Sequence, residues 1–237
     1  MSVLLIDGGN SRTKWALFDT GRITEQGVVS NHQRLDYEWP TPTTGTLFAS
    51  VRHDEALVEV LQQQSDRPLH RLNAPQPELG DFTHCYVDPT RLGVDRWLAM
   101  LGAQAHTQEA ALVVDAGTAL TLDLLDANRA HLGGYIVPGL TMARQALFQG
   151  TDKVIAFDDE REQDSLAPGQ STLACVASGT LRQMAAFVGA VAEDHPGHRL
   201  MITGGDGSAL AEALGARYYP DLIFDGMGTL CAGLFTA

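Results

Sequence analysis

The sequence predicts a duplicated α/β fold, and three observations lead to this prediction. First, a short apolar strand that ends on Asp7 and a glycine turn recurs at residues 111–117, where a similar strand ends on Asp115. Second, each copy continues into another apolar segment and an acidic turn, so that each forms a hairpin unit. Third, the expected element order βββαβα occurs twice in degraded form, as in a duplicated mixed domain. The predicted halves are residues 1–110 and 111–237.

In the first half, apolar periodicity and turn residues define the expected elements. Apolar runs bounded by glycine, asparagine or aspartate predict strands at 3–7, 14–18, 22–30, 46–51 and 69–72. Residues 31–45, rich in proline and threonine, predict a loop. Helices are expected over 54–64 and from about residue 94. Their inner faces consist of Leu57, Val58 and Leu61 in the first and of Val94, Leu98, Leu101 and Ala105 in the second.

In the second half, the same rules predict strands at 111–115, 121–125, 133–138 and 200–203. Helices are expected at 141–149, from 171 or 172 to 194, at 208–214 and at 226–235. Residues 151–170 contain six acidic residues and predict a solvated surface loop. The long helix should bury one face, which includes Val176, Leu181, Met184, Val188 and Val191.

The composition excludes several classes of protein. With 44% hydrophobic and 19% charged residues the chain is globular, and its net charge of −13 argues against nucleic-acid or anionic-membrane partners. Three cysteines, Cys85, Cys175 and Cys231, have no metal-ligand spacing and are expected to be reduced thiols. The N-terminus has no basic region, and no continuous apolar run approaches a membrane span. We therefore expect a soluble, cytoplasmic protein.

The turn from Asp7 to Lys14 is the first candidate site. Its amides and the side chains of Asn10, Ser11, Arg12 and Lys14 offer donors and positive charge to phosphate oxygens. Strand alternation places Arg12 and Lys14 on the same face. The segment lacks the glycine and Lys-Ser/Thr pattern of a P-loop, and a glycine-asparagine turn also occurs without any ligand.

The second and third candidates are the turns at residues 115–121 and 203–207. Asp115 occupies the place of Asp7, and two equivalent carboxylates suit a hydrated divalent cation that carries a nucleotide. Thr118 and Thr121 add hydroxyls. The three glycines of 203–207 suit a flat ring or sugar against the backbone, although a tight connection without function looks similar.

Asp95 and Arg96 lie in the first turn of the helix that follows Leu92-Gly93. An acidic residue there is ordinarily a partner of the helix dipole, so position alone favours a structural role for Asp95. His53, His84 and His131 lack spaced partners and are interpreted as surface or satisfied core residues.

Together, the segments 7–14, 115–121 and 203–205 resemble the phosphate and adenosine turns of the sugar kinase, heat-shock ATPase and actin superfamily. Tyr86 and the runs 92–96 and 133–139 resemble type III pantothenate kinase, and the match spans nearly the whole chain in order. The resemblance implies duplicated ribonuclease H-like (actin-like ATPase) domains with a cleft between them. It implies ATP-dependent phosphorylation of pantothenate to 4′-phosphopantothenate, the first step of coenzyme A biosynthesis, with magnesium, a monovalent cation (potassium or ammonium) and a homodimer.

Carried over by matching position, the resemblance implies roles for three groups of residues. Asp95 would be the base, Asp115 would bind the monovalent cation, and Arg96 would pair with the carboxylate of pantothenate. Val94 replaces the more usual alanine of the Gly-Ala-Asp-Arg run. The ATP contacts would be Asp7, Gly8, Gly9, Asn10, Ser11, Arg12, Thr13, Lys14 and Thr118, and the pantothenate contacts Tyr86, Gly93, Val94, Asp95, Arg96 and Thr172.

Three other functions compete with this one. Another small-molecule kinase of the same superfamily would share the turns. Relatives have also been regarded as accessory transcription factors, but the net charge and the absence of a basic helix disfavour direct DNA binding. A nucleotide-gated switch of the actin or chaperone kind would need a peptide-binding domain, for which the chain is short.

Overall fold

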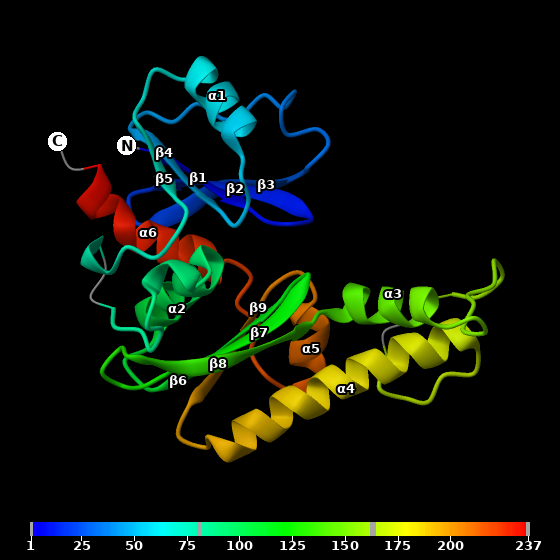
Figure 1. Cartoon of the computed structure of the whole chain (residues 1–237). Helices are drawn as coiled ribbons and strands as arrows, with labels where there is room; N and C mark the ends of the chain where they lie inside the picture. Colours follow the sequence, from blue (N-terminus) through cyan, green and yellow to red (C-terminus); the bar gives the residue numbers. More distant parts are fainter. Residues whose placement is uncertain (1, 80–81, 162–164, 236–237) are drawn as a thin grey trace. The chain divides into compact units, whose positions relative to one another are not determined.

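The computed structural model describes residues 2–79, 82–161 and 165–235, which form two compact units (Figure 1). Unit 1 contains residues 1–108, 129–131 and 221–237, and unit 2 contains residues 109–128 and 132–220. The C-terminal residues are therefore part of unit 1. The division of the chain into halves at 1–110 and 111–237 remains a prediction.

Unit 1 is built on a five-stranded sheet with the order β3-β2-β1-β4-β5. Helix α1 covers one face, where Trp15, Phe48 and Leu57 pack in a hydrophobic cluster, and α6 lies on the other face (Figure 1). The elements are β1 (Ser2–Gly8), β2 (Arg12–Asp19), β3 (Arg22–Ser30), β4 (Gly45–Ser50), α1 (Glu55–Gln64), β5 (Leu69–Leu72), the short 3-10 helices η1 (Pro77–Leu79) and η2 (Pro89–Arg91), α2 (Val94–His106) and α6 (Leu222–Leu234).

Helices α2 and α6 of unit 1 cross with their backbones in contact. A Cβ on Gly102 would overlap the carbonyl of Leu222, and a Cβ on Gly226 would overlap the carbonyl of Leu98. Both positions therefore require glycine, which lets backbones approach closely. This contact explains Gly226 of the last helix, which begins at Leu222 and not at the predicted residue 226.

The predicted single inner face of α2 is only partly correct. Val94, Leu98 and Leu101 are buried as expected, but Ala105 is exposed, and Trp97 and its neighbours on the other sides of the helix are buried as well. Both α6 and β4 contact α2, so more than one neighbour covers this helix.

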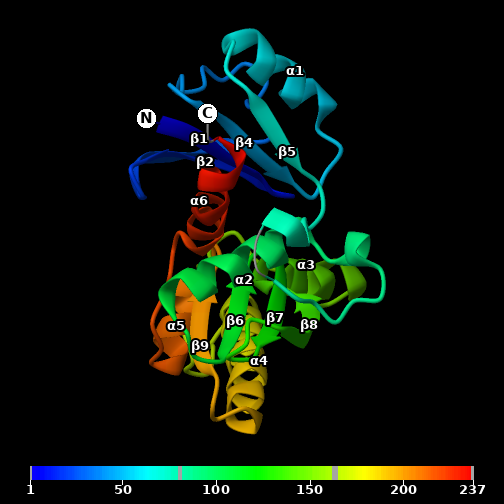
Figure 2. The same ribbon diagram turned by 90° about the vertical axis from the view of Figure 1, so that its left-hand side faces the viewer.

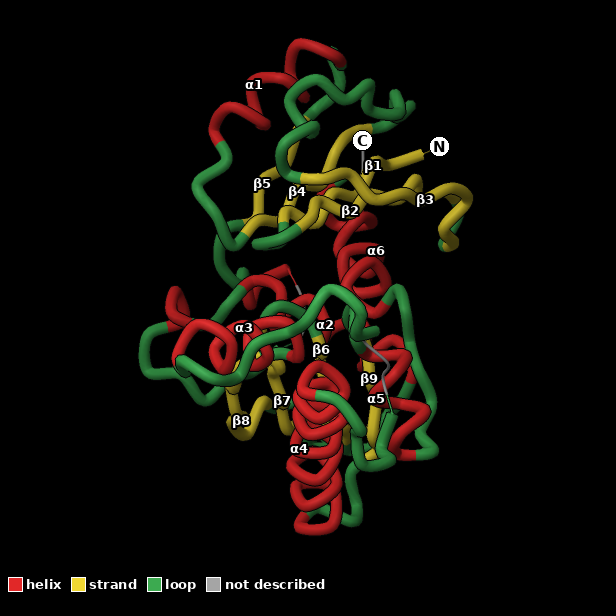
Figure 3. Tube along the Cα trace, turned by 90° about the vertical axis from the view of Figure 1, so that its right-hand side faces the viewer, coloured by secondary structure: helices red, strands yellow, loops and turns green. Residues whose placement is uncertain are grey.

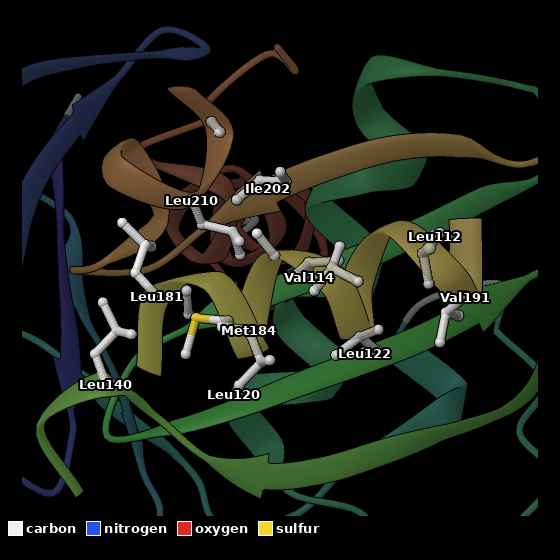
Figure 4. Packing of buried hydrophobic residues seen from close by; sticks show 14 of the residues in the cluster. Leu112, Val114, Leu120, Leu122, Leu140, Leu181, Met184, Val191, Ile202 and Leu210 are labelled. Carbon is white, nitrogen blue, oxygen red and sulfur yellow. The ribbon is translucent and has the colours of Figure 1, made fainter. Parts of the chain in front are cut away.

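Unit 2 is built on a four-stranded sheet with the order β8-β7-β6-β9, whose strands lie side by side in Figure 2. Figure 4 shows apolar side chains of α4 and α5 packed on this sheet, among them Leu181 and Met184 against Leu120. The elements are β6 (Ala111–Ala116), β7 (Ala119–Leu125), β8 (His131–Pro138), α3 (Leu140–Gly150), α4 (Thr172–Asp194), β9 (Arg199–Thr203) and α5 (Gly207–Leu214).

The two sheets share one topology, which confirms the predicted duplication. In unit 1, β1 pairs antiparallel with β2 and parallel with β4; in unit 2, β6 pairs antiparallel with β7 and parallel with β9. Asp7 lies opposite Lys14 and Ala49, whereas Asp115 lies opposite Thr121 and Thr203. The two aspartates therefore occupy equivalent positions in their own units.

Helix α4 has 23 residues and is apolar enough, by length and composition, to cross a membrane. Half of its most apolar window is buried, and Figure 3 shows α4 as one continuous helix. All five residues of the predicted core face are buried, and Leu181, Met184, Val188 and Val191 lie in the hydrophobic cluster of unit 2 (Figure 4). Packing in a protein core accounts for its apolar character. Within the acidic segment 151–170, residues 162–164 lie outside the described residues, and most of the others are exposed.

Candidate nucleotide and substrate site

The first Asp-Gly turn connects β1 to β2 in unit 1. Asp7 and Lys14 are half-buried partners on these strands, whereas Asn10, Ser11 and Arg12 are exposed. Gly8, which precedes them, is buried, and Gly9 is half-buried. The exposed residues can reach a ligand, and their contacts with ATP remain a prediction.

The Thr13 side chain differs from its neighbours. It is fully buried, and its hydroxyl donates to Oδ1 of Asn31 over 2.9 Å. Strand alternation explains this, because Thr13 points to the face opposite Arg12 and Lys14. A contact between ATP and the Thr13 side chain does not fit this burial, so the prediction for Thr13 is restricted to its backbone.

Side chains from two other loops hold this turn, and sequence reasoning missed them. Nδ2 of Asn31 donates to the carbonyls of Gly9 (3.3 Å) and Asn10 (2.9 Å), and Arg52 also donates to the Asn10 carbonyl over 3.2 Å. Ser50 and Asp54 hold Arg52 in turn. The Ser50 hydroxyl accepts from the Arg52 amide and donates to Oδ2 of Asp54 over 2.8 Å. No local pattern identifies these residues.

The second Asp-Gly turn lies between β6 and β7 of unit 2, and backbone groups hold it. The amide of Gly139, at the start of α3, donates to the Thr118 carbonyl over 3.1 Å, and the Asp206 amide donates to the Ala116 carbonyl over 2.8 Å. Asp115 is half-buried and Thr118 is exposed. The turn of residues 203–207 therefore contacts the second phosphate-type turn directly.

Gly204 makes this contact possible. Its φ is +94°, and a Cβ would overlap Oδ1 of Asp115 and the carbonyl of Ala116. The conformation and the close approach both exclude other residues. The third predicted turn is thus packed against the carboxylate of the second.

The predicted substrate residues of unit 1 converge at the start of α2. Asp95 is the second residue of the helix, and its Oδ1 accepts from the Arg96 amide over 2.8 Å. The guanidinium of Arg96, whose residue is 6% exposed, donates to the Tyr86 hydroxyl over 2.9 Å. The structure therefore brings Arg96 and Tyr86 into direct contact.

His131, which was expected from the sequence to be a surface or core residue, belongs to the same cluster. It is buried, and its ring is stacked on that of Tyr86 at 6.0 Å, with Nδ1 3.8 Å from the Cys85 sulfur. An isolated bridge between Thr83 and Ala130 places it there. Such a contact between distant segments leaves no local signal in the sequence.

The segment between Tyr86 and α2 is ordered by Asp88. Its carboxylate accepts from the hydroxyl of Thr90 (2.6 Å), from the Thr90 amide (3.1 Å) and from Arg91 (3.1 Å). The hydroxyl of Thr90, followed by its amide, lowers the pKa of Asp88 below its ordinary value. Asp88 is therefore ionised at neutral pH and caps η2.

Thr172 is the first residue of α4 in unit 2, next to the cap residue Ser171. The amides of Thr172 and Leu173 donate to the carboxylate of Glu160, over 3.3 and 2.7 Å. The acidic segment thus caps the helix where a pantothenate contact is predicted. The other residues predicted for pantothenate, 86 and 93–96, belong to unit 1.

The described residues include no group of three or more histidine, cysteine, aspartate or glutamate side chains placed to hold a metal ion. Magnesium usually takes one or two protein carboxylates and fills its other positions with water and phosphate oxygens. The half-buried carboxylate of Asp7 fits that requirement.

Comparison with known proteins shows which family this chain is similar to. The family model described as type III pantothenate kinase matches residues 3–194. A protein of Azotobacter vinelandii named type III pantothenate kinase is 34% identical, with 97% of this chain and 98% of the relative covered.

Two solved structures share the fold. A proposed Baf family transcriptional activator from Campylobacter jejuni is 26% identical with a TM-score of 0.66, and covers 97% of this chain and 98% of its own. A proposed 2-dehydro-3-deoxygalactonokinase from Sinorhizobium meliloti has a TM-score of 0.59 at 12% identity, and the match covers 99% of this chain and 100% of the other. At this identity the similarity shows only that the fold is shared. The extent of the family match and of the pairwise identity shows that this chain belongs to the type III pantothenate kinase family.

Proposed function

We propose that this protein transfers the γ-phosphoryl group of ATP to the primary hydroxyl of pantothenate and so forms 4′-phosphopantothenate for coenzyme A biosynthesis. Membership of the family supports the reaction. The observation that carries it is the duplication, in which Asp7 and Asp115 end equivalent strands next to equivalent glycine turns. Phosphoryl transfer needs mainly positioned donors and charge, and both turns offer them.

In this proposal Asp95 is the general base. The bond from the Arg96 amide holds the carboxylate at the start of α2, where it is proposed to orient the attacking hydroxyl. The positive end of the helix dipole favours the ionised carboxylate, which is the form that accepts a proton. Because proton transfer is late in phosphoryl transfer, the carboxylate has only to align the hydroxyl and take its proton at the end.

Arg96 and Tyr86 are proposed to bind the carboxylate of pantothenate. The Tyr86 hydroxyl uses one of the five N–H donors of the guanidinium and so fixes its plane. A fixed guanidinium is well shaped for a carboxylate. His131, stacked on Tyr86, supports the ring of the tyrosine.

ATP and a divalent cation are the cofactors that the kinase family implies. Residues 7–14, with Thr13 through its backbone, and Thr118 are proposed to hold ATP, with Asp7 near the cation. Asp115 is proposed to bind potassium or ammonium, because a half-buried carboxylate beside backbone carbonyls matches the oxygen ligands of such ions. When bound, the divalent cation neutralises charge on the phosphates.

We also propose that the protein is a cytoplasmic homodimer without nucleic-acid or membrane partners. The family resemblance supports the dimer, and the net charge of −13 supports the absence of anionic partners. Sedimentation that finds an active monomer at assay concentrations would contradict the dimer.

The test of the reaction is ADP release by the purified protein with a panel of small alcohols. We expect turnover with pantothenate and little with sugars or other alcohols. A second candidate, an accessory factor of transcription, is favoured by the description of the Campylobacter jejuni structure. Absence of turnover with every alcohol, together with specific DNA or protein binding, would favour that candidate.

A further inference from the structure

Asn31 ties the first glycine turn to the interior of unit 1. It follows β3 directly, and the pairing of Arg12 with Ser30 places it beside the turn. Its Oδ1 accepts from Thr13, so the orientation of the carboxamide is defined. Its two Nδ2 protons then go to the carbonyls of Gly9 and Asn10.

Holding these two carbonyls also sets the direction of two amides. In a trans peptide the C=O of one residue and the N–H of the next point in opposite directions. The carbonyls of Gly9 and Asn10 point to Asn31, so the amides of Asn10 and Ser11 point away from it. Two consecutive amides directed to the same side form an anion-binding arrangement of the kind that holds phosphate.

Arg52 supports the same orientation from a second loop. Its guanidinium donates to the Asn10 carbonyl, and its backbone amide donates to the Ser50 hydroxyl. Ser50 is fixed in turn by Asp54, a fully buried carboxylate paired with Arg34. The Asn10 carbonyl thus has two donors, which come from the ends of two different strands.

In the equivalent turn of unit 2 the carbonyls are also held by hydrogen bonds, but from backbone donors. There, backbone amides of Gly139 and Asp206 hold the carbonyls of Thr118 and Ala116. Both halves of the duplication therefore fix the carbonyls of their glycine turn from within the unit.

We propose that Asn31, oriented by Thr13, is a positioning residue for the phosphates of ATP. It acts through the amides of Asn10 and Ser11 and does not touch the nucleotide. This inference rests on the proposed function, in which the turn of residues 7–14 binds ATP.

Two substitutions that leave the charge unchanged test this proposal by steady-state kinetics. Asn31→Ala removes both donors to the turn, and we expect the KM for ATP to rise about tenfold, the equivalent of one hydrogen bond of about 1.4 kcal/mol. The KM for pantothenate should change less than about twofold. Thr13→Val, which keeps the shape of a fully buried side chain, should raise the KM for ATP in the same direction by a smaller factor.

Two further variants serve as comparisons. Thr13→Ser keeps the hydroxyl and should lie closer to wild type than Thr13→Val. Thr24→Val removes an exposed hydroxyl that donates to the Leu17 carbonyl near the opposite end of β2 and β3, and should leave the KM for ATP unchanged.

The outcomes separate the two proposals. Wild-type turnover combined with an unchanged KM for ATP in both Asn31→Ala and Thr13→Val would overturn the role of Asn31, even if both variants melt earlier. If Asn31→Ala does not fold, Thr13→Val alone decides. A wild-type protein without ATP turnover would overturn the proposed function itself.

Discussion

Gly204→Ala places a methyl group between the second and third turns of unit 2. The backbone at this position has φ of +94°, which an alanine adopts at a cost of about 1–2 kcal/mol. The new Cβ would also overlap Asp115 and the backbone of Ala116, and backbone atoms cannot rotate away. Overlap of this kind costs about 1–3 kcal/mol, so Gly204→Ala should lower the free energy of unfolding by about 2–5 kcal/mol in total.

Gly215→Ala is the matched control. Gly215 also has a left-handed backbone, with φ of +61°, but apart from its chain neighbours no residue has an atom within 4 Å of the position of its Cβ. Gly215→Ala should therefore lower the free energy of unfolding only by the cost of the left-handed backbone, about 1–2 kcal/mol.

Thermal melting of both variants gives the comparison. At roughly 2–4 °C per kcal/mol for a chain of this size, Gly204→Ala should melt about 4–20 °C below wild type and Gly215→Ala about 2–8 °C below. Gly204→Ala should also lose kinase activity, because Asp115 has to move, whereas Gly215→Ala should keep it. Equal losses of stability and equal activities would refute the close contact between Gly204 and Asp115.

Three further predictions concern Asp95, Asp115 and the cysteines. Asp95→Asn should lower turnover by about 10²–10⁴-fold with melting temperature and ATP affinity close to wild type; near-normal turnover would return Asp95 to the role of a helix-dipole partner. Turnover should require potassium or ammonium, and Asp115→Asn should abolish the difference between potassium and sodium; equal activity of the wild-type protein in sodium alone would contradict the cation site. Burial raises the pKa of Cys231 to about 12, so a thiol reagent at pH 8 should label the exposed Cys85 and Cys175 in the native protein and the third thiol only after unfolding; rapid labelling of all three would contradict the burial of Cys231.

The sequence was informative wherever the signal is local. The repeated strand and Asp-Gly turn predicted the equivalent positions of Asp7 and Asp115, and the three-to-four spacing in α4 predicted its buried face. Alternation along β2 also agrees with the burial of Thr13, because it places Thr13 on the face opposite Arg12 and Lys14.

Contacts between distant segments could not be predicted in this way. Asn31 reaches the first turn only because of the register of β3, and His131 reaches Tyr86 through a bridge between remote loops. The crossing of α2 and α6 depends on two glycines more than a hundred residues apart, each of which alone lowers the helix propensity of its segment. Such pairings become visible only when the chain is folded.

The position of α6 also determines the order in which the protein can be completed during synthesis. In unit 1, Phe18 contacts Gly228 and Gly45 contacts Phe235. This part of the first sheet is therefore covered only after residues near the C-terminus have been synthesised. Unit 2 is translated in between, and the ~110 residues from 109 to 220 take roughly 5–20 s at ~5–20 residues per second. During that interval the nascent sheet has an uncovered apolar face, which is the kind of surface that ribosome-associated chaperones bind.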